Sequence, residues 1–394
     1  MTPAARTQAA IELLDAIIVA ARDGGASADV LIARGLAARR YAGSKDRRAI
    51  RDLVYEAIRL CGERPESGRA ALLALAARDP ALGATFDGSA YGPAPIGGDE
   101  RPAQRGTAPA WLTDLLAASG IDAGQAAALL NRAPLDLRIN PLRATPDRVR
   151  AAFPQAQPIA GLPLALRLPA DTRVEASAVM HDGWIEVQDA GSQAVTLAAG
   201  AAPGMRVVDL CAGGGGKTLA LAAAMAGRGA ILASDADRPR LSRLLPRAER
   251  AGVSIVETRL LDPGREDQAL GDWQAAADVV LIDAPCSGTG TWRRNPEARW
   301  RLTPARLARL VAIQARLLDI GAALVRPGGT LVHIVCSLLD AEGADQVAAF
   351  LSANHGWSAV PPALPFGCPH GAGMRLTPLS DSTDGFFVAK LVRA

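Results

Sequence analysis

The sequence Val207-Val208-Asp209-Leu210-Cys211-Ala212-Gly213-Gly214-Gly215-Gly216-Lys217-Thr218 passes from an apolar pair through one acidic residue into four consecutive glycines, and an Ala- and Leu-rich stretch follows. This order predicts a strand, a tight turn and a helix. Because glycine has no Cβ, the turn can adopt positive φ angles and let a bound molecule lie directly against backbone amides. The helix that follows points its amide end at the same place.

Two common glycine motifs are excluded by their spacing. A Walker A loop needs glycine where the chain has Cys211. The dinucleotide fingerprint Gly-x-Gly-x-x-Gly fails because its third glycine would fall on Thr218 or Leu219. The pattern that remains, apolar-apolar-Asp-x-x-x-Gly-x-Gly, resembles the loop by which Rossmann-like methyltransferases hold S-adenosylmethionine. A simple glycine turn is the alternative.

Length and composition narrow the class of protein. A chain of 394 residues suits two or three domains. Its formal net charge is only +3, so any nucleic-acid contact must come from local basic clusters. The five scattered cysteines favour a reducing compartment, and neither a signal peptide nor a membrane-length span is recognisable, so we expect a cytoplasmic protein without a membrane partner. Cys368 and His370 form a single close Cys/His pair, and we predict no metal site.

The N-terminal part of the chain has the pattern of a small helical domain. In residues 1–79 apolar side chains recur at helical spacing, as at Ile11, Leu14 and Ile18. A basic cluster within this region is formed by Arg39, Arg40, Lys45, Arg47, Arg48 and Arg51. The cluster is either a solvated face or a phosphate-contact surface for RNA. Gly, Pro and Asp dominate residues 80–108, which predicts a linker.

The sequence after residue 108 predicts two further regions that contain both helices and strands. Residues 109–187 mix short helical and extended patterns, which favours a small α+β module packed on the domain that follows. Strands and helices alternate over residues 188–394, which predicts an α/β domain with a doubly wound sheet. The expected strands of this sheet are 206–210, 230–234, 254–258, 278–282, 330–335 and 386–392.

Three carboxylates stand at the expected ends of strands, where ligands bind in such sheets. Asp235 follows the second strand and is suited to accept the ribose hydroxyls of a nucleoside. Asp262 follows the third strand and is suited to the exocyclic amine of adenine. Asp283 ends the fourth. Each alone is more often a turn residue or an N-cap, but three acids and a glycine loop at matching positions predict a cofactor site.

Two thiols follow neighbouring strands of the same sheet. Cys286 lies in Asp283-Ala284-Pro285-Cys286-Ser287-Gly288-Thr289-Gly290, and Cys336 follows His333-Ile334-Val335. A lone cysteine is usually a small buried hydrophobe. A thiolate is also well suited to conjugate addition, and methylation of a pyrimidine at carbon 5 needs such an addition at carbon 6. Asp283 is placed to hydrogen-bond the ring nitrogen or amine of a cytosine.

These motifs together resemble the Sun/RsmB (Nop2/Sun) family of RNA cytosine-C5 methyltransferases. The resemblance covers residues 130–394 and includes Val187-Gln188-Asp189, Arg293-Arg294-Asn295-Pro296, Cys336-Ser337 with Glu342, and Asp384-Gly385-Phe386-Phe387. It implies a Rossmann-like class I methyltransferase domain. More weakly, the helical N-terminus is similar to a shortened NusB-like RNA-binding domain.

The resemblance also implies roles for the residues. Cys336 is expected to be the nucleophile and Cys286 to help release the product, a division that the residues alone leave open. The catalytic residues are thus Cys336, Cys286 and Asp283, and the implied cofactor is S-adenosyl-L-methionine. Its expected binding residues are Cys211, Ala212, Gly213, Gly214, Gly215, Gly216, Lys217, Asp235, Asp262 and Asp283.

The chain departs from the family pattern at three positions. Gly213 and Gly214 replace Ala and Pro, which makes the free loop more flexible and is expected to lower cofactor affinity. Val335 replaces the usual Thr before the nucleophile and removes a hydroxyl contact to substrate. We predict methylation of RNA, with ribosomal 16S RNA as the expected substrate, gripped in part by Arg293, Arg294, Arg299 and Arg301. The alternatives are a non-catalytic RNA-binding or ribosome-assembly factor and a small-molecule methyltransferase.

Overall fold

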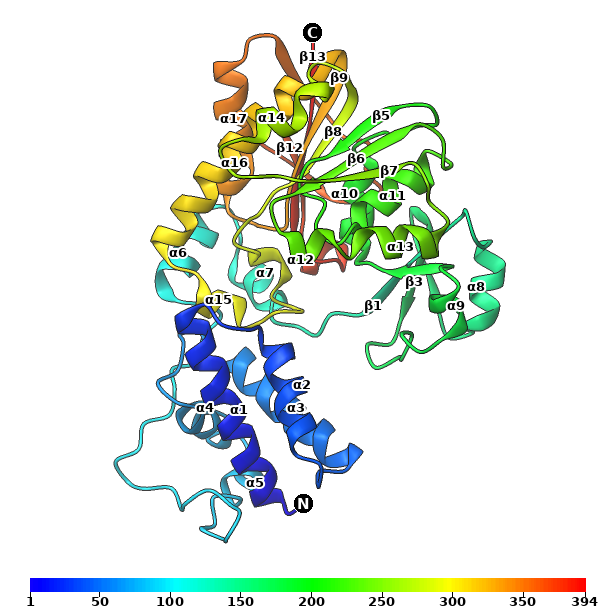
Figure 1. Ribbon diagram of the computed structural model, residues 1–394. Coiled ribbons are helices and arrows are strands. Elements are labelled where there is room, and N and C mark those ends of the chain that lie inside the picture. Colours follow the sequence, from blue (N-terminus) through cyan, green and yellow to red (C-terminus); the bar gives the residue numbers. More distant parts are fainter. The chain divides into compact units, whose positions relative to one another are not determined.

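The computed structural model describes residues 1–394, and the chain forms two compact units (Figure 1). The helical unit consists of Met1–Asn131 together with Thr291–Thr303, which we call the returning segment. The sheet unit consists of Arg132–Gly290 and Pro304–Ala394. The chain therefore leaves the sheet unit shortly after Cys286, contributes a short segment to the helical unit, and re-enters the sheet unit.

The helical unit is built around the N-terminal helices that the apolar spacing predicts. The first helix is capped by the Thr2 hydroxyl, which accepts the Ala5 N–H, and has Pro3 in its first turn. Ile17, Ile50 and Leu72 are fully buried in the common core. The helices are α1 (Pro3–Asp23), α2 (Ala28–Ala38), α3 (Ser44–Leu60), α4 (Gly68–Ala76), α5 (Pro80–Gly83), α6 (Ala110–Ala118), α7 (Ala123–Ala128) and α15 (Ala298–Arg301) of the returning segment.

The helical unit extends well beyond residue 79, the boundary expected from the sequence. The stretch 80–108, expected to be a linker, is fixed to the helices by backbone and side-chain contacts. Arg69 of α4 pairs with Glu100, and its hydrogen bonds lower the pKa of that carboxyl to about 2. The Ala103 N–H also donates to the Ala70 carbonyl at 2.9 Å. These contacts join residues distant in sequence, so the Gly- and Pro-rich composition gave no sign of them.

The module expected over residues 109–187 is also divided differently in the structure. Helices α6 and α7 belong to the helical unit, where Glu63 accepts the Ala110 N–H at 3.0 Å. The antiparallel sheet of the module begins only at Leu135 and has the order β2-β3-β1-β4. Its elements are β1 (Leu135–Ile139), α8 (Pro146–Ala152), β2 (Gln157–Ile159), β3 (Leu162–Leu168), α9 (Ala178–His181) and β4 (Ile185–Val187).

The large sheet of the sheet unit confirms the predicted doubly wound α/β class. Its order is β11-β12-β13-β9-β8-β5-β6-β7, with β10 paired to β13. Strands β5 to β9 run parallel, and β13 is antiparallel to β9. The strands are β5 (Arg206–Asp209), β6 (Ala230–Asp235), β7 (Val256–Leu260), β8 (Ala277–Asp283), β9 (Val325–Val335), β10 (Trp357–Val360), β11 (Cys368–His370), β12 (Gly373–Leu376) and β13 (Phe386–Arg393).

Helices cover both faces of this sheet, and alternate strand residues form a core with each layer (Figure 1). Val207 and Leu281 pack toward one layer, whereas Val208 and Val280 pack toward the other. The first layer contains α10 (Ala190–Leu197), α11 (Gly216–Ala224), α12 (Arg238–Leu241) and α13 (Leu244–Ala251). The second contains α14 (Glu266–Leu270), α16 (Pro304–Leu324) and α17 (Ala344–Ala353). Shorter elements are η1 (Gly271–Trp273), η2 (Thr289–Thr291), η3 (Asp340–Glu342) and α18 (Pro378–Asp381).

The strand order fixes where a ligand site forms. From β5 the chain proceeds outward through β6 and β7, and it then returns to β8 on the other side of β5. This reversal opens a crevice at the carboxyl ends of β5 and β8, which is where ligands bind in doubly wound sheets. Asp209 and Asp283 are the last residues of these two strands.

Candidate active site

The glycine loop joins β5 to α11 as the sequence predicts, and its conformation requires glycine. Gly215 has φ +86°, a left-handed angle that L side chains rarely adopt. A Cβ on Gly215 would also lie 2.6 Å from the Leu244 Cγ. The loop thus follows a path close to α13 that a larger residue at this position would block.

Asp209 lies beneath this loop and is fully buried. The Thr218 hydroxyl donates to its Oδ2 at 2.6 Å, which ties the end of β5 to the first turn of α11. Burial raises the pKa of Asp209 to about 7, against the opposing effect of the Thr218 hydrogen bond. Its Oδ1 has no hydrogen-bond partner in the structure. A buried oxygen whose lone pairs are unoccupied is suited to a ligand that carries hydrogen-bond donors, such as an amine.

Asp235 at the end of β6 holds the other side of the loop. Its carboxylate accepts the Gly213 N–H and the Asp237 N–H, each at 2.7 Å. Each carboxylate oxygen has further lone pairs, so these bonds leave capacity for ribose hydroxyls. The glycine loop, the orphaned Asp209 oxygen and the oriented Asp235 carboxylate fit a nucleoside cofactor with an amino-acid end.

Lys217 and Asp283 form an ion pair across the crevice, with the Lys217 Nζ 2.7 Å from Asp283 Oδ2. The Lys217 side chain is nearly buried and its ammonium lies 5.7 Å from the centre of the Phe386 ring. Burial alone would lower the pKa of Lys217, but attraction to Asp283 outweighs it and the pKa is raised. Lys217 therefore remains a cation that holds the Asp283 carboxylate in place.

The two predicted thiols are in contact. Cys286 Sγ and Cys336 Sγ are 3.4 Å apart, within hydrogen-bond distance for sulfur, and both are free. Parallel pairing of β8 with β9 brings the strand ends together, with Asp283 opposite Ile334. The hydrogen bond with Cys336 and burial raise the pKa of the Cys286 thiol well above its ordinary value. The Cys286 thiol is therefore harder to ionise than a thiol exposed to water.

Two further predicted cofactor residues, Cys211 and Asp262, have different surroundings. Burial raises the pKa of the Cys211 thiol, and the surrounding carboxylates Asp235, Asp209 and Asp283 raise it further, so ionisation of Cys211 is disfavoured. Asp262 is exposed, two residues beyond the end of β7. Its carbonyl accepts the Arg265 N–H, and the preceding Leu261 N–H bonds to the Asp235 carbonyl. Asp262 therefore lies at the Asp235 edge of the crevice.

Polar residues surround the thiols, and all of them except Gln314 belong to the motifs quoted from the sequence. The Ser337 hydroxyl is 3.1 Å from the Ser287 hydroxyl and 3.0 Å from that of Thr289. Gln314 of α16 and Glu342 of η3 are also fully buried near Cys286. Gln314 is far in sequence from every motif, and its one sequence mark is a polar side chain within an otherwise apolar stripe of a helix.

Two of the four arginines expected to grip RNA, Arg299 and Arg301, are bound to backbone carbonyls of the helical unit. Arg299 is fully buried and donates to the carbonyls of Ile58 at 2.5 Å and Cys61 at 2.9 Å. Arg301 donates to the carbonyls of Gly25 at 2.8 Å and Ala26 at 2.5 Å. Both guanidiniums bind carbonyls near helix C-terminal ends, where positive charge is favoured. The expectation for this pair was wrong because their backbone partners lie far away in sequence.

The basic cluster of the helical unit divides into paired and exposed members. Arg39 pairs with Glu12, and Arg47 donates to the Ala42 carbonyl at 2.8 Å. The remaining members, Arg40, Lys45, Arg48 and Arg51, are exposed, and the Tyr41 ring among them is 72% exposed. The exposed members are the part of this cluster that is free for contacts with another molecule.

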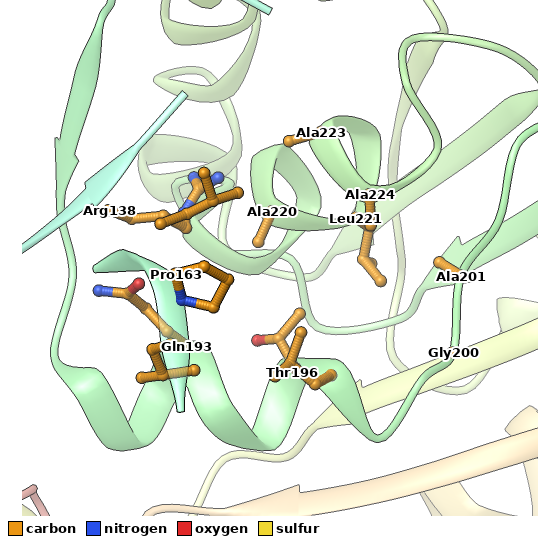
Figure 2. Close-up of a pocket in the computed structure, with 13 residues that line it drawn as sticks. Arg138, Pro163, Gln193, Thr196, Gly200, Ala201, Ala220, Leu221, Ala223 and Ala224 are labelled. Atoms are coloured by element: carbon orange, nitrogen blue, oxygen red, sulfur yellow. The ribbon is translucent and has the colours of Figure 1, made fainter. Parts of the chain in front are cut away.

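An apolar cavity of about 220 Å³ lies elsewhere in the sheet unit, between β3, α10 and α11 (Figure 2). Its walls include Pro163, Thr196 and Ala220, and none of the predicted site residues lines it. Arg138 lies at the edge of the cavity, and its guanidinium donates to the Gln188 side chain at 2.7 Å. This cavity is separate from the thiols and the glycine loop.

The fold and the site define the class of protein: an S-adenosylmethionine-dependent methyltransferase with a Rossmann-like domain. The family model described as 16S rRNA methyltransferase RsmB/F matches residues 196–392. The probable ribosomal RNA small subunit methyltransferase B of Synechocystis is 36% identical over 304 residues, covering 73% of this chain and 67% of that protein. The chain belongs to the RsmB/F family of 16S rRNA methyltransferases.

A second curated relative and two solved structures are also similar to this chain. Ribosomal RNA small subunit methyltransferase B of Salmonella newport is 35% identical over 66% of this chain, and the match spans 60% of that protein. The crystal structure of NSun6 from Pyrococcus horikoshii with SFG covers 71% of this chain and 97% of its own, with a TM-score of 0.63 and 17% identity. That of PH0851 covers 99% of both chains with a TM-score of 0.77 and 23% identity. At these identities the two structures support the fold alone.

No three His, Cys, Asp or Glu side chains are grouped as metal ligands would be. None of the helices combines the length and apolar character needed to cross a bilayer.

Proposed function

We propose that this protein transfers a methyl group from S-adenosylmethionine to carbon 5 of a cytosine in 16S rRNA, through a covalent bond between Cys336 and the base. The observation that carries the proposal is the 3.4 Å contact of Cys286 and Cys336 at the end of β8 and β9. Methylation at carbon 5 of a pyrimidine is a reaction that needs a thiolate, because this carbon is otherwise too weak a nucleophile. A cytoplasmic location follows from this substrate.

The residues of the loop and the strand ends would hold the cofactor. The glycine loop, Asp235 and Asp262 are assigned to its nucleoside and Asp209 to its amino end, and the bound cofactor supplies an electrophilic methyl group. Asp283, oriented by Lys217, is assigned a hydrogen bond to the cytosine ring nitrogen or amine. This bond stabilises the charge that develops when sulfur adds to the ring.

In the proposed covalent step the Cys336 thiolate adds to carbon 6 and the electron pair of the carbon 5–carbon 6 double bond makes carbon 5 nucleophilic. Once carbon 5 carries the methyl group, its proton must leave, and the returning electron pair expels the Cys336 thiolate. We assign the removal of that proton to Cys286. The hydrogen bond with Cys336 is the largest cause that raises the pKa of Cys286. Bonding of Cys336 to the base removes this cause, so Cys286 becomes easier to ionise at the stage where a base is needed. Cys286 then releases its own proton to solvent, and the resulting thiolate takes the proton from carbon 5.

The RNA contact is assigned to the exposed members of the basic cluster, Arg40, Lys45, Arg48 and Arg51. Arginine and lysine clusters supply sequence-independent affinity for phosphates. The target base has to leave its stack to reach the thiols, which favours looped or single-stranded RNA. A non-catalytic assembly factor is disfavoured by the intact thiol pair and by Asp283.

The test is methyl transfer from radiolabelled S-adenosylmethionine to undermethylated ribosomal RNA by the full chain, followed by nucleoside analysis. We expect label in 5-methylcytidine of 16S rRNA and none with Cys336→Ala. Label in another nucleoside would refute the carbon 5 assignment. Absence of transfer to any RNA by folded, cofactor-binding protein would favour the assembly factor instead.

A further inference from the structure

The backbone on both sides of Cys286 is held by two side chains that the proposed mechanism does not use. Gln314 Nε2 donates to the Pro285 carbonyl at 2.9 Å. Glu342 Oε1 accepts the Ser287 N–H at 2.8 Å. Gln314 Nε2 also donates to Glu342 Oε1 at 3.1 Å, so the two side chains are joined to each other. Together they form a clamp around the peptide that carries the thiol.

The chemistry of the partners fixes the direction of these bonds. A carbonyl and a carboxylate both accept, so Gln314 must present its NH2 group to them. Gln314 and Glu342 are both fully buried, so loss of a hydrogen bond from either side chain is costly. The Gln314 Oε1 has no partner, and this side chain is held by its NH2 group alone. Glu342 is fixed further because its carboxylate accepts the Ser287 hydroxyl and its carbonyl accepts a hydrogen bond from His333 Nε2 at 3.1 Å.

The clamp also connects to the second thiol. Glu342 lies in η3, which begins four residues after Cys336. Ser287 and Ser337, the residues that follow the two cysteines, share a hydrogen bond of 3.1 Å between their hydroxyls. The Gly290 N–H donates to the Cys336 carbonyl at 3.0 Å. The loop after β8 and the loop after β9 are thus bonded at several points around the sulfur pair.

We propose that Gln314 and Glu342 are positioning residues that hold Cys286 in contact with Cys336. Neither side chain reaches the sulfurs, and both act through the peptide units of Pro285 and Ser287. The role of the thiol pair in catalysis rests on the proposed function, whereas the position of the sulfurs does not. The negative charge of Glu342 has a second, smaller effect, since it adds to the Cys336 hydrogen bond and burial in raising the pKa of Cys286.

The direct test measures how readily one reagent bridges the two sulfurs. Dibromobimane alkylates two thiols that lie close together in space, one after the other, and becomes fluorescent when both have reacted. We would compare the full chain with Glu342→Gln and Gln314→Met, two changes of similar volume that remove an acceptor and a donor. Exposed residues supply matched controls, Glu249→Gln and Gln268→Leu. Mapping of the bridged peptide assigns the signal to Cys286 and Cys336.

We expect the bridging rate, divided by the rate at which monobromobimane alkylates Cys286, to fall about tenfold in Glu342→Gln and in Gln314→Met, a factor of the size expected for loss of one hydrogen bond to a charged group. The division removes any change in the reactivity of the single thiol, which Glu342→Gln should increase. The controls should stay within about twofold of the wild type. In methyl transfer both variants should lower kcat, leave the KM for RNA unchanged, and accumulate covalent protein–RNA complex as loss of Cys286 does. A merely structural role would not produce that complex.

Two results would overturn the proposal. Folded variants that are bridged at the wild-type rate would show that the clamp does not set the sulfur positions, and the proposed methylation would be unaffected. Wild-type protein that is not bridged at all would refute the thiol contact itself. If Glu342→Gln does not fold, Gln314→Met alone decides the outcome, because methionine suits its buried helical position.

Discussion

Replacement of Arg299 by methionine tests whether the returning segment stabilises the helical unit or contacts RNA. Arg299 is fully buried, and its guanidinium donates to the carbonyls of Ile58 and Arg59 near the end of α3 as well as to Cys61. Burial lowers its pKa to about 9. Arg299 also donates to the Pro296 carbonyl. Cys61 keeps a second donor, the Trp300 Nε1 at 3.1 Å, so the three other carbonyls lose the guanidinium without such a replacement.

The expected loss of stability follows from these bonds. A buried carbonyl that loses its donor costs about 1–3 kcal/mol, and methionine avoids the desolvation of a guanidinium, so we expect a net loss of about 3 kcal/mol for Arg299→Met. For a unit of this size that corresponds to a fall of about 6–12 °C in Tm. Arg48→Met, at an exposed position of α3, should change Tm by less than about 2 °C.

The assay is thermal unfolding of the full chain by circular dichroism, with RNA affinity measured against salt concentration below the transition. We expect Arg299→Met to lower Tm and to leave the salt dependence unchanged, whereas Arg48→Met should reduce the salt slope by about one phosphate contact. An unchanged Tm together with a weaker salt dependence in Arg299→Met would refute the structural role and restore the arginine to the RNA surface.

Three further predictions concern the active site. Gly215→Ala should destabilise the protein by about 1–3 kcal/mol in thermal unfolding, because φ is +86° and its Cβ would meet Leu244, whereas Gly216→Ala, with the nearest atom 4.0 Å away, should be nearly neutral. Burial lowers the pKa of His333 to about 4, below its unfolded value, so the unfolded state binds the extra proton and stability should fall as the pH drops from about 6.5 to 4. Urea titrations should show this loss, up to about 3 kcal/mol, reduced in His333→Gln; an equal loss in both would contradict it. Lys217→Met removes the ammonium 2.7 Å from Asp283 and should lower kcat about 100-fold in single-turnover assays, with little change in the Kd for RNA.

Local patterns were enough to predict most of the large sheet. The stretch Val207–Thr218 encodes its strand, turn and helix within twelve residues of chain. Strand ends were less well predicted, because a strand ends where its neighbour stops pairing. The third strand was expected at residues 254–258. In the structure this strand, β7, is Val256–Leu260, because it pairs with β6 from Ile231 to Asp235.

The candidate site was predicted where its residues follow strands directly. Asp235, Asp283 and Cys336 needed only the strand assignment and the rule that ligands bind at carboxyl ends. Gln314 and Arg299 could not be assigned in this way. Gln314 contacts Pro285 across 29 positions of sequence, and Arg299 contacts Ile58 across 241. Only the folded chain brings such pairs together.

The central claim, that the Cys336 sulfur bonds to the substrate base, is tested most directly by trapping the covalent complex. Cys286→Ala protein is incubated with RNA and S-adenosylmethionine and separated on a denaturing gel, beside Cys336→Ala and the double variant. We expect a protein–RNA complex with Cys286→Ala, cross-linked through Cys336, and none with the other two. A complex that persists in the double variant, or its absence from Cys286→Ala protein that binds both RNA and cofactor, would contradict the account.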